Sequence, residues 1–328
     1  MDFKENGVNQ IYLSEDESKA IREAFECASI AMDRIGTGDI NVPQLKANSD
    51  SQHATGYHPL GGHLSSKYNR YREGFVFSDG ELFNVDLPGK DEASSFESTM
   101  EKARSILHNL AMKAVQDIET EMGLPQGYIK NKYGLGSSLL ESSQWHLKRY
   151  DEICSKIQHG NGENEIQSND EECDLALGVH TDPSIVSVVI HDAPNIQQGG
   201  WGLQYAKRKE NTTEWREVPL HGRGIATVMV GAAFARIMRV GENTQKNERV
   251  DQLRKLYPPV RHRVVMQSQQ TSTRRRMALT YFLRPSPSSI LEPLPVFTKL
   301  HVTPPRKQQA FGTWYQRVSS RYGKSDSK

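Results

Sequence analysis

Apolar residues recur every three or four positions in two long stretches of the N-terminal half, which predicts two amphipathic helices. The first is expected to begin at the capping box Ser14–Glu17 and to end at Gly36. The second is expected to begin at a similar box, Ser94–Glu97, and to stop before Pro125, where a glycine and a proline close it. Their apolar stripes are Ile21, Ala24, Phe25, Ala28, Ala31, Met32 and Ile35 in the first, and Phe96, Met100, Ala103, Leu107, Leu110, Ala114 and Ile118 in the second.

From about Trp145 to Leu283 the pattern changes to short runs of β-branched and aromatic residues between turn-forming residues. The candidate strands are Trp145–Tyr150, Ile185–Ile190, Gly202–Ala206, Trp215–Pro219, Ile225–Val230, His262–Met266 and Met277–Leu283. A last amphipathic helix carries Phe311, Trp314, Tyr315, Val318 and Tyr322 on one side. The succession predicts a mainly β protein with flanking helices, whose core is a jelly roll (a double-stranded β-helix, cupin-like) with a pocket between its two sheets.

The domain organisation predicted from this pattern is a single functional unit. Residues 1–134 are expected to form a helical and mixed region that packs on the core, and residues 135–328 to form the jelly roll with its C-terminal helix. The polar, acidic segment 155–173 is expected to be a surface loop that acts as a lid over the site.

Composition excludes several classes of protein. The 328 residues are 25% charged with a formal net charge of +1, which argues against a general nucleic-acid binder. The longest apolar stretch, Ile225–Ala235, is far shorter than the ~20 residues of a membrane span. The three cysteines, Cys27, Cys154 and Cys173, have no metal-binding spacing and form no even disulfide set. We therefore expect a monomeric, cytoplasmic protein with a small-molecule partner.

The candidate chemistry lies in His180-Thr181-Asp182 and the distant His262. Taken alone, a His-x-Asp triplet is a weak signal, because eleven histidines in such a chain would produce roughly one by chance. In a strand, however, residues two apart point the same way, so His180 and Asp182 could bind one ion together. Two histidines and a carboxylate on one face of a metal are typical of non-haem Fe(II) oxygenases. The adjacent pair His191-Asp192 diverges in a strand and is expected at the surface.

Arg276 is a candidate carboxylate-binding residue, because a planar guanidinium can hold a carboxylate by two parallel hydrogen bonds. Strand alternation places Arg276, Ala278 and Thr280 on one face. The alternative is that 274–276, three consecutive arginines, form a solvated basic run.

With these residues the chain resembles the isopenicillin N synthase-like family of Fe(II)- and 2-oxoglutarate-dependent dioxygenases over nearly its whole length. The order and spacing of several short motifs carry the resemblance. They are Gly56-Tyr57, Arg72-Glu73-Gly74-Phe75, Leu124-Pro125, Gly200-Trp201-Gly202-Leu203-Gln204, Trp215–Pro219, Ile225–Gly231, Arg261-His262-Arg263-Val264 and Arg276-x-Ala278. The chain departs from the family pattern in two places: Ala278 replaces the usual serine, and the segment between Met238 and Pro258 is longer than the family usually has.

The resemblance implies a complete reaction. It implies Fe(II) bound by His180, Asp182 and His262, 2-oxoglutarate as co-substrate with its distal carboxylate on Arg276, and O2 as oxidant. Tyr150 resembles a tyrosine that often contacts 2-oxoglutarate, and a buried structural role is the alternative for it. The implied outcome is oxidation of a C–H bond of a small-molecule metabolite in specialised biosynthesis, with release of succinate and CO2.

Several forms of this reaction stay open at the level of sequence. Hydroxylation is the default, and desaturation and oxidative cyclisation are the other options. Two different functions also fit the pattern: a same-fold Fe(II) oxidase that does not consume 2-oxoglutarate, and a non-catalytic jelly-roll protein that binds a ligand in the pocket.

Overall fold

Two antiparallel sheets and a short two-stranded pair form the core of this computed structural model. The structure describes residues 3–40, 55–60, 72–78, 85, 87, 95–136, 143–150, 175–193, 195–198, 202–209, 212–238, 252, 255–265, 276–294 and 309–322. The predicted mainly β architecture with flanking helices is confirmed.

The larger sheet has seven strands in the order β1-β11-β6-β13-β4-β3-β2, and each neighbouring pair is antiparallel. These strands are β1 (Val8–Tyr12), β2 (Gly56–His58), β3 (Arg72–Ser78), β4 (Gln144–Tyr150), β6 (Val186–His191), β11 (Ile225–Val230) and β13 (Arg276–Leu283). The strands near its centre read as almost continuous apolar runs, and every residue of β6 and β11 is buried. Such strands are covered on both faces.

The smaller sheet has four strands in the order β5-β12-β8-β9 and faces the larger one. Its strands are β5 (Leu175–His180), β8 (Leu203–Lys209), β9 (Thr212–Glu217) and β12 (His262–Val265). The two-stranded pair consists of β7 (Gln197–Gln198) and β10 (Leu220–His221). Two facing antiparallel sheets with these connections are the double-stranded β-helix predicted from the sequence.

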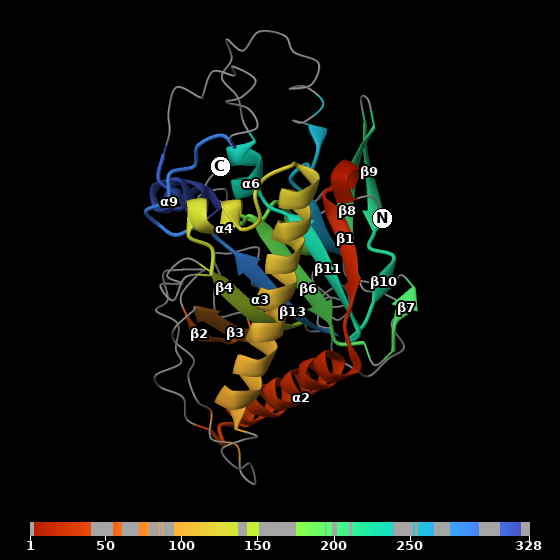
Figure 1. The fold of residues 1–328 in the computed structure, drawn as a ribbon. Helices are drawn as coiled ribbons and strands as arrows, with labels where there is room; N and C mark the ends of the chain where they lie inside the picture. The colour runs from red at the N-terminus through yellow and green to blue at the C-terminus, as the bar shows by residue number, and fades with distance from the viewer. Residues whose placement is uncertain are drawn as a thin grey trace, which may run out of the picture.

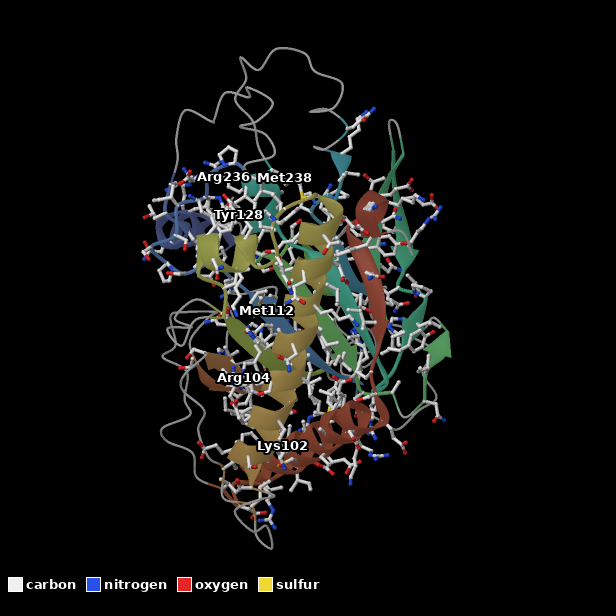
Figure 2. All side chains as sticks on the ribbon, in the orientation of Figure 1. Lys102, Arg104, Met112, Tyr128, Arg236 and Met238 are labelled. Carbon is white, nitrogen blue, oxygen red and sulfur yellow. The ribbon has the colours of Figure 1, made fainter. Side chains whose placement is uncertain are left out.

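Helices cover the face of the larger sheet that points away from the smaller one (Figure 1). Helix α3 (Phe96–Glu121) packs across β6, β11 and β13, and α2 (Glu15–Thr37) packs against α3. The Nδ1 atom of His108 on α3 lies 2.9 Å from the Tyr281 hydroxyl oxygen, so this face of β13 is the helix-covered one. On its outer side α3 carries charged residues such as the exposed Lys102 (Figure 2).

The remaining helices are short or terminal. They are α1 (Phe3–Asn6), α4 (Tyr128–Tyr133), α6 (Ala232–Ile237) and α9 (Phe311–Tyr322). The last of these is the predicted C-terminal amphipathic helix, with Phe311 and Trp314 buried. Among the residues that the structure describes, no helix has the length and apolar character that a membrane crossing requires.

The helix ends follow capping chemistry, with two corrections to the predicted boundaries. Ser14 and Glu17 form the expected capping box, but α2 runs through Gly36 and ends where Gly38 adopts a left-handed φ of 80°. Helix α3 is capped by Ser95, whose hydroxyl accepts from the Ser98 N–H at 3.2 Å, so the expected box one residue earlier is wrong. Phe96 is fully buried, and this burial fixes where the helix begins.

The predicted strands are all present, with ends shifted by at most three residues. Six described strands were not among the predicted ones: β1, β2, β3, β5, β7 and β10. Of these, β5 leads directly into the candidate metal site. Parts of other predicted features lie outside the described residues: the segment 155–173, Gly200 and Trp201, Arg274 and Arg275, and most of the segment between Met238 and Pro258.

Two of the sequence motifs meet in the fold and hold β3 against β4. The Tyr57 hydroxyl donates to the Glu73 carboxylate at 2.5 Å, and the Arg149 Nε donates to the same carboxylate at 2.8 Å. Arg149 also donates to Asp33 of α2 at 2.6 Å. Next to this cluster, Gly74 has a φ of 143°, and a Cβ there would lie 2.0 Å from the Leu147 carbonyl oxygen. Only glycine fits this position.

Arg149 and its partners lie on the helix-covered face of the larger sheet, where Trp145 stacks on Phe77 with ring centroids 4.0 Å apart. Because side chains alternate along a strand, the intervening residues of β4 point to the opposite face. These are His146, Lys148 and Tyr150, and all three line a pocket between the two sheets. The network on one face of β4 therefore supports the residues that this strand presents to the pocket.

Candidate active site

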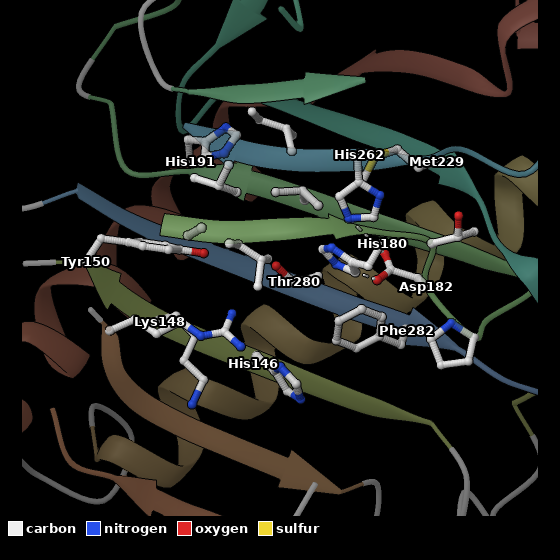
Figure 3. A pocket seen from close by; sticks show the side chains of 18 of the residues that line it. His146, Lys148, Tyr150, His180, Asp182, His191, Met229, His262, Thr280 and Phe282 are labelled. Carbon is white, nitrogen blue, oxygen red and sulfur yellow. Dashed lines mark ion pairs between the residues drawn. The ribbon is translucent and has the colours of Figure 1, made fainter. Parts of the chain in front are cut away.

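The pocket between the sheets contains the candidate metal cluster at one end, and His191 and Tyr150 at the other (Figure 3). Arg276 contacts both of these residues and therefore lies at their end of the pocket. The larger sheet contributes alternate residues of β13, namely Arg276, Ala278, Thr280 and Phe282. The predicted shared face of this strand is therefore present. The smaller sheet contributes His180, His262 and apolar side chains such as Leu177 and Leu203.

His180, Asp182 and His262 converge so that their ligand atoms all lie within 4.8 Å of one another. The Nε2 atom of His180 lies 3.5 Å from Oδ1 of Asp182, and the Nε2 atom of His262 lies 3.7 Å from Oδ2. Two ligand atoms bound to one ion at ~2.1 Å are at most ~4.2 Å apart. Small side-chain adjustments would therefore bring all three residues to a shared ion.

The other nitrogen of each histidine fixes the tautomer that metal binding requires. His180 Nδ1 lies 2.8 Å from the Gly178 carbonyl oxygen, and His262 Nδ1 lies 3.2 Å from the Val260 carbonyl oxygen. A carbonyl oxygen only accepts, so each Nδ1 is the protonated donor and each Nε2 presents its lone pair to the cluster. This arrangement is typical of metal-binding histidines.

The charges of the cluster also suit a cation. Burial lowers the pKa of His262 to about 4, with His180 adding to the effect, so this imidazole is neutral near pH 7. Burial alone would raise the pKa of the Asp182 carboxyl, but His262, His180 and Ser187 outweigh it and hold that pKa well below its usual range. A neutral imidazole and an ionised carboxylate are the forms that bind metals.

Asp182 reaches the cluster from a turn, and not from the strand that was predicted to carry both His180 and Asp182. His180 is the last residue of β5, and Asp182 lies beyond the strand, so the two do not share a face by strand alternation. Instead, the Asp182 carbonyl accepts from the Ala232 N–H at 2.7 Å at the start of α6, which fixes the turn. The side chain then turns back toward His180 and receives a hydrogen bond from Ser187.

Arg276 lies at the other end of the pocket, above the ring of Tyr150. Its guanidinium carbon is 4.6 Å from the ring centroid, and the two residues are register partners across β13 and β4. The Arg276 Nη2 donates to His191 Nε2 at 3.2 Å. None of the described carboxylates forms an ion pair with Arg276. A partly buried guanidinium of this kind can bind a ligand carboxylate.

The pair His191-Asp192 is buried, so the prediction that it lies at the surface is wrong. His191 is 2% exposed and Asp192 3%. His191 accepts from Arg276 and lies 3.1 Å from the Nδ1 of His221, while Asp192 forms an ion pair with Arg223 at 2.5 Å. The pair follows a run of five residues that are all buried in a strand near the centre of the sheet. That run was the available sign of burial.

Comparison with known proteins agrees with this geometry. Residues 156–285 match the family described as the 2OG-Fe(II) oxygenase superfamily. This segment contains the three cluster residues and Arg276. Among curated protein sequences, none matches the chain.

Solved structures share the fold over almost the whole chain at low sequence identity. A full-length Neurospora crassa protein in complex with alpha-KG and 5-formyluracil has a TM-score of 0.62 at 15% identity, covering 97% of this chain and 86% of that one. A 2OG-Fe(II) oxygenase family protein from Caulobacter crescentus has a TM-score of 0.61 at 13% identity, covering 97% and 91%. The rice dioxygenase for auxin oxidation has a TM-score of 0.57 at 16% identity, covering 98% and 87%. The chain therefore shares its fold with these proteins, and its segment 156–285 is similar to the 2OG-Fe(II) oxygenase superfamily.

Proposed function

We propose that this chain is an Fe(II)- and 2-oxoglutarate-dependent oxygenase that oxidises a C–H bond of a small-molecule metabolite. One observation carries the proposal. The metal-binding atoms of His180, Asp182 and His262 meet at one end of a pocket, and Arg276 lies at the other end without an acidic partner among the described residues. A dicarboxylate that spans the pocket would contact a metal with one end and Arg276 with the other.

Each residue of the pocket has a part in this function. His180, Asp182 and His262 would bind Fe(II) from one side and leave its other positions open to the pocket. When bound, the metal with 2-oxoglutarate and O2 supplies the oxidising power, and succinate and CO2 are released. Arg276 binds the distal carboxylate and Tyr150 supports its guanidinium. Apolar neighbours such as Phe282 and Met229 exclude water from the metal end of the pocket.

The structural relatives support the use of 2-oxoglutarate, because the Neurospora crassa protein was crystallised with alpha-KG. They also support a small-molecule substrate, since that protein binds 5-formyluracil and the rice protein is a dioxygenase for auxin oxidation. The proposal includes a likeness to the isopenicillin N synthase-like family and a role in specialised metabolism. It also includes a monomeric state and a cytoplasmic location. Hydroxylation is the expected reaction, with desaturation and oxidative cyclisation as the other outcomes.

Two competing functions predict different behaviour. A same-fold oxidase that does not consume 2-oxoglutarate needs no co-substrate carboxylate on Arg276, which is partly buried against Tyr150 and His191. A non-catalytic ligand-binding protein has no use for the three converging metal-binding residues. The arrangement of the pocket therefore favours the oxygenase over both.

A screen for succinate release tests the proposal. Purified protein with Fe(II), 2-oxoglutarate and O2 is mixed with candidate metabolites, and succinate and oxidised product are measured. We expect a productive metabolite to give both in equal amounts, and expect both to disappear when 2-oxoglutarate is omitted. Product formed without 2-oxoglutarate would support the oxidase instead. A metabolite that binds tightly but gives no succinate under any condition would support the binding protein.

A further inference from the structure

The pocket carries more positive charge than the proposed reaction uses. Among the described residues, its lining includes four cationic side chains, Arg72, Lys148, Arg276 and Arg284, and one carboxylate, Asp182. Fe(II) and 2-oxoglutarate carry opposite charges of equal size, so binding both leaves this excess unchanged. Arg276 is assigned to 2-oxoglutarate. Arg284 donates to Gln144 Oε1 at 2.9 Å and lies over the ring of Tyr315, so it has structural contacts of its own.

Lys148 is a buried cation for which the described part of the chain supplies no hydrogen-bond or ion-pair partner. The residue is 5% exposed, yet among the described residues it forms no side-chain hydrogen bond and no ion pair. Its register neighbours are Ala278 on β13 and Gly74 on β3, and neither has a side chain that could pair with an ammonium. The nearest acidic network, around Glu73, lies on the opposite face of β4, where it binds Arg149.

An unpaired buried ammonium is costly to the folded chain. Burial, and then the charge of Arg72, lower the pKa of Lys148 well below its ordinary value, and the charge of Glu73 only partly offsets them. Because Lys148 lines the pocket, an anion bound there would reach it and favour its charged form. The position therefore suits a ligand group that is negatively charged.

Lys148 lies on a different strand from the arginine that is assigned to 2-oxoglutarate. Arg276 and Thr280 lie on β13, whereas Lys148 lies one strand further away from β6, on β4 between His146 and Tyr150 (Figure 3). Arg72 comes from the next strand, β3, where it is the register partner of Tyr150. Lys148 and Arg72 therefore form a second cationic region on β4 and β3, next to the arginine on β13 that is assigned to 2-oxoglutarate.

We propose that the substrate is an organic anion, a carboxylate or a phosphate ester, whose charged group binds Lys148 with Arg72 and whose carbon skeleton extends toward the metal cluster. This inference rests on the proposed function and deepens it. An anionic group bound to Lys148 would determine which C–H bond of the substrate lies beside the metal, because the position of Lys148 on β4 sets the distance between this group and the metal cluster. Neutral molecules of the same shape would leave the buried ammonium unpaired and would bind weakly.

Matched pairs of ligands test the proposal directly. Hexanoate, phenylacetate and phenyl phosphate are compared with hexanamide, phenylacetamide and phenol on anaerobic protein loaded with Fe(II) and 2-oxoglutarate. The rise in melting temperature measures binding, because a ligand that binds only the folded chain stabilises it. We expect at least one anion to raise the melting temperature and its neutral partner to have little effect. Comparison of the carboxylates with phenyl phosphate shows which anionic group is preferred.

Three variants assign the effect to Lys148. Lys148→Met should weaken binding of the anion about tenfold or more, and Lys148→Arg should retain most of it. Lys113→Met is the matched control, because it removes an exposed lysine from α3, and it should bind the anion as the wild type does. The dissociation constant of 2-oxoglutarate, measured by anaerobic titration, should change less than about twofold in all three variants.

The possible outcomes separate this proposal from the proposed function. Equal binding of anions and neutral partners by the wild type, or full anion binding by Lys148→Met, would overturn it. A tenfold loss of 2-oxoglutarate affinity in Lys148→Met, with anion binding unchanged, would instead make Lys148 a second anchor for the co-substrate beside Ala278. If the wild type binds no Fe(II) or 2-oxoglutarate at all, the proposed function fails, and the same ligand pairs tested on metal-free protein still decide whether Lys148 selects anions.

Discussion

His180 and His262 are register partners across β5 and β12, and their ring centroids lie 4.1 Å apart. The pairing of two strands that are more than 80 residues apart in the sequence therefore brings together the two histidines of the cluster. Backbone hydrogen bonds of the smaller sheet hold their separation, and the carbonyl partners of both Nδ1 atoms hold their orientation. The pairing of β5 with β12 thus positions the two histidines of the cluster.

Removal of one cluster residue should abolish turnover and leave the fold intact. His180→Ala and Asp182→Ala each delete a ligand atom and little apolar volume, so their circular dichroism and cooperative unfolding should match those of metal-free wild type. Bound iron should fall to background in both. Succinate release at the wild-type rate in either variant would show that the residue is not a ligand.

Arg276→Ala should raise the KM for 2-oxoglutarate about tenfold or more, because a charged hydrogen-bonded pair contributes ~1.5–3 kcal/mol. Arg274→Ala and Arg275→Ala serve as controls and should do far less. Ala278→Ser restores the usual hydroxyl on the same face and should lower the KM by about a few-fold at most. A larger effect of Arg275→Ala than of Arg276→Ala would contradict the side-chain directions found in β13.

His191→Leu should weaken 2-oxoglutarate binding through Arg276. The imidazole accepts from the guanidinium at 3.2 Å, so its loss frees Arg276 to leave its position above Tyr150. We expect the KM for 2-oxoglutarate to rise about threefold to tenfold with little change in kcat at saturation. In the Arg276→Ala background the same substitution should add almost nothing. Equal effects in both backgrounds would show that His191 acts independently of Arg276.

Acid should destabilise the fold partly through His221. Burial, and then the charge of Arg276, lower the pKa of His221 to about 4 in the folded chain, against ~6.5 when the chain is unfolded. Between these values only the unfolded chain binds the extra proton, so the free energy of unfolding falls as the pH drops through this window. The loss attributable to His221 is on the order of 3 kcal/mol.

Urea unfolding of the metal-free protein at pH 7, 6 and 5 measures this effect, with His221→Phe as the comparison. The variant should show a shallower dependence of stability on pH than the wild type. Parallel curves for the two proteins would mean that His221 does not resist protonation in the folded chain.

Glu73→Ala should destabilise the protein by about 3–5 kcal/mol, because it leaves the buried Arg149 and Tyr57 without their shared partner. Asp33→Ala is the matched control. It removes the other carboxylate that binds Arg149, but the Asp33 side chain is 60% exposed, so it should cost less than about 1 kcal/mol. Chemical denaturation of both variants provides the comparison, and similar losses in the two would contradict the structural role assigned to Glu73.

Local chemistry made much of the fold predictable from the sequence. The cap at Ser14, the strand Ile225–Val230 and the alternation of Arg276 with Ala278 depend on residues that are close together in the chain. Features that depend on distant pairing were missed or misplaced. His191 is buried because it lies in a central strand that is covered on both faces. The spacing of apolar residues along this strand does not indicate that burial.

The candidate site was predictable to a similar extent. The three cluster residues and Arg276 were named from motifs, and the structure brings them to one pocket. The prediction that His180 and Asp182 share a face of one strand was wrong. The turn after β5 depends on a hydrogen bond to α6, and no sequence motif indicates this bond. Lys148 was overlooked for a similar reason, since its burial depends on Gly74 and Ala278 on neighbouring strands.

The central claim is that one pocket binds Fe(II) and 2-oxoglutarate together, and an anaerobic titration tests it most directly. Fe(II) is added to the metal-free protein, then 2-oxoglutarate, and the visible absorption spectrum is recorded after each step. The account predicts a metal-to-ligand charge-transfer band that appears only after 2-oxoglutarate is added and saturates at one equivalent of each. The band should be absent in Asp182→Ala and should require much more 2-oxoglutarate in Arg276→Ala. A wild-type protein that binds Fe(II) without developing the band, or a full band in Asp182→Ala, would contradict the account.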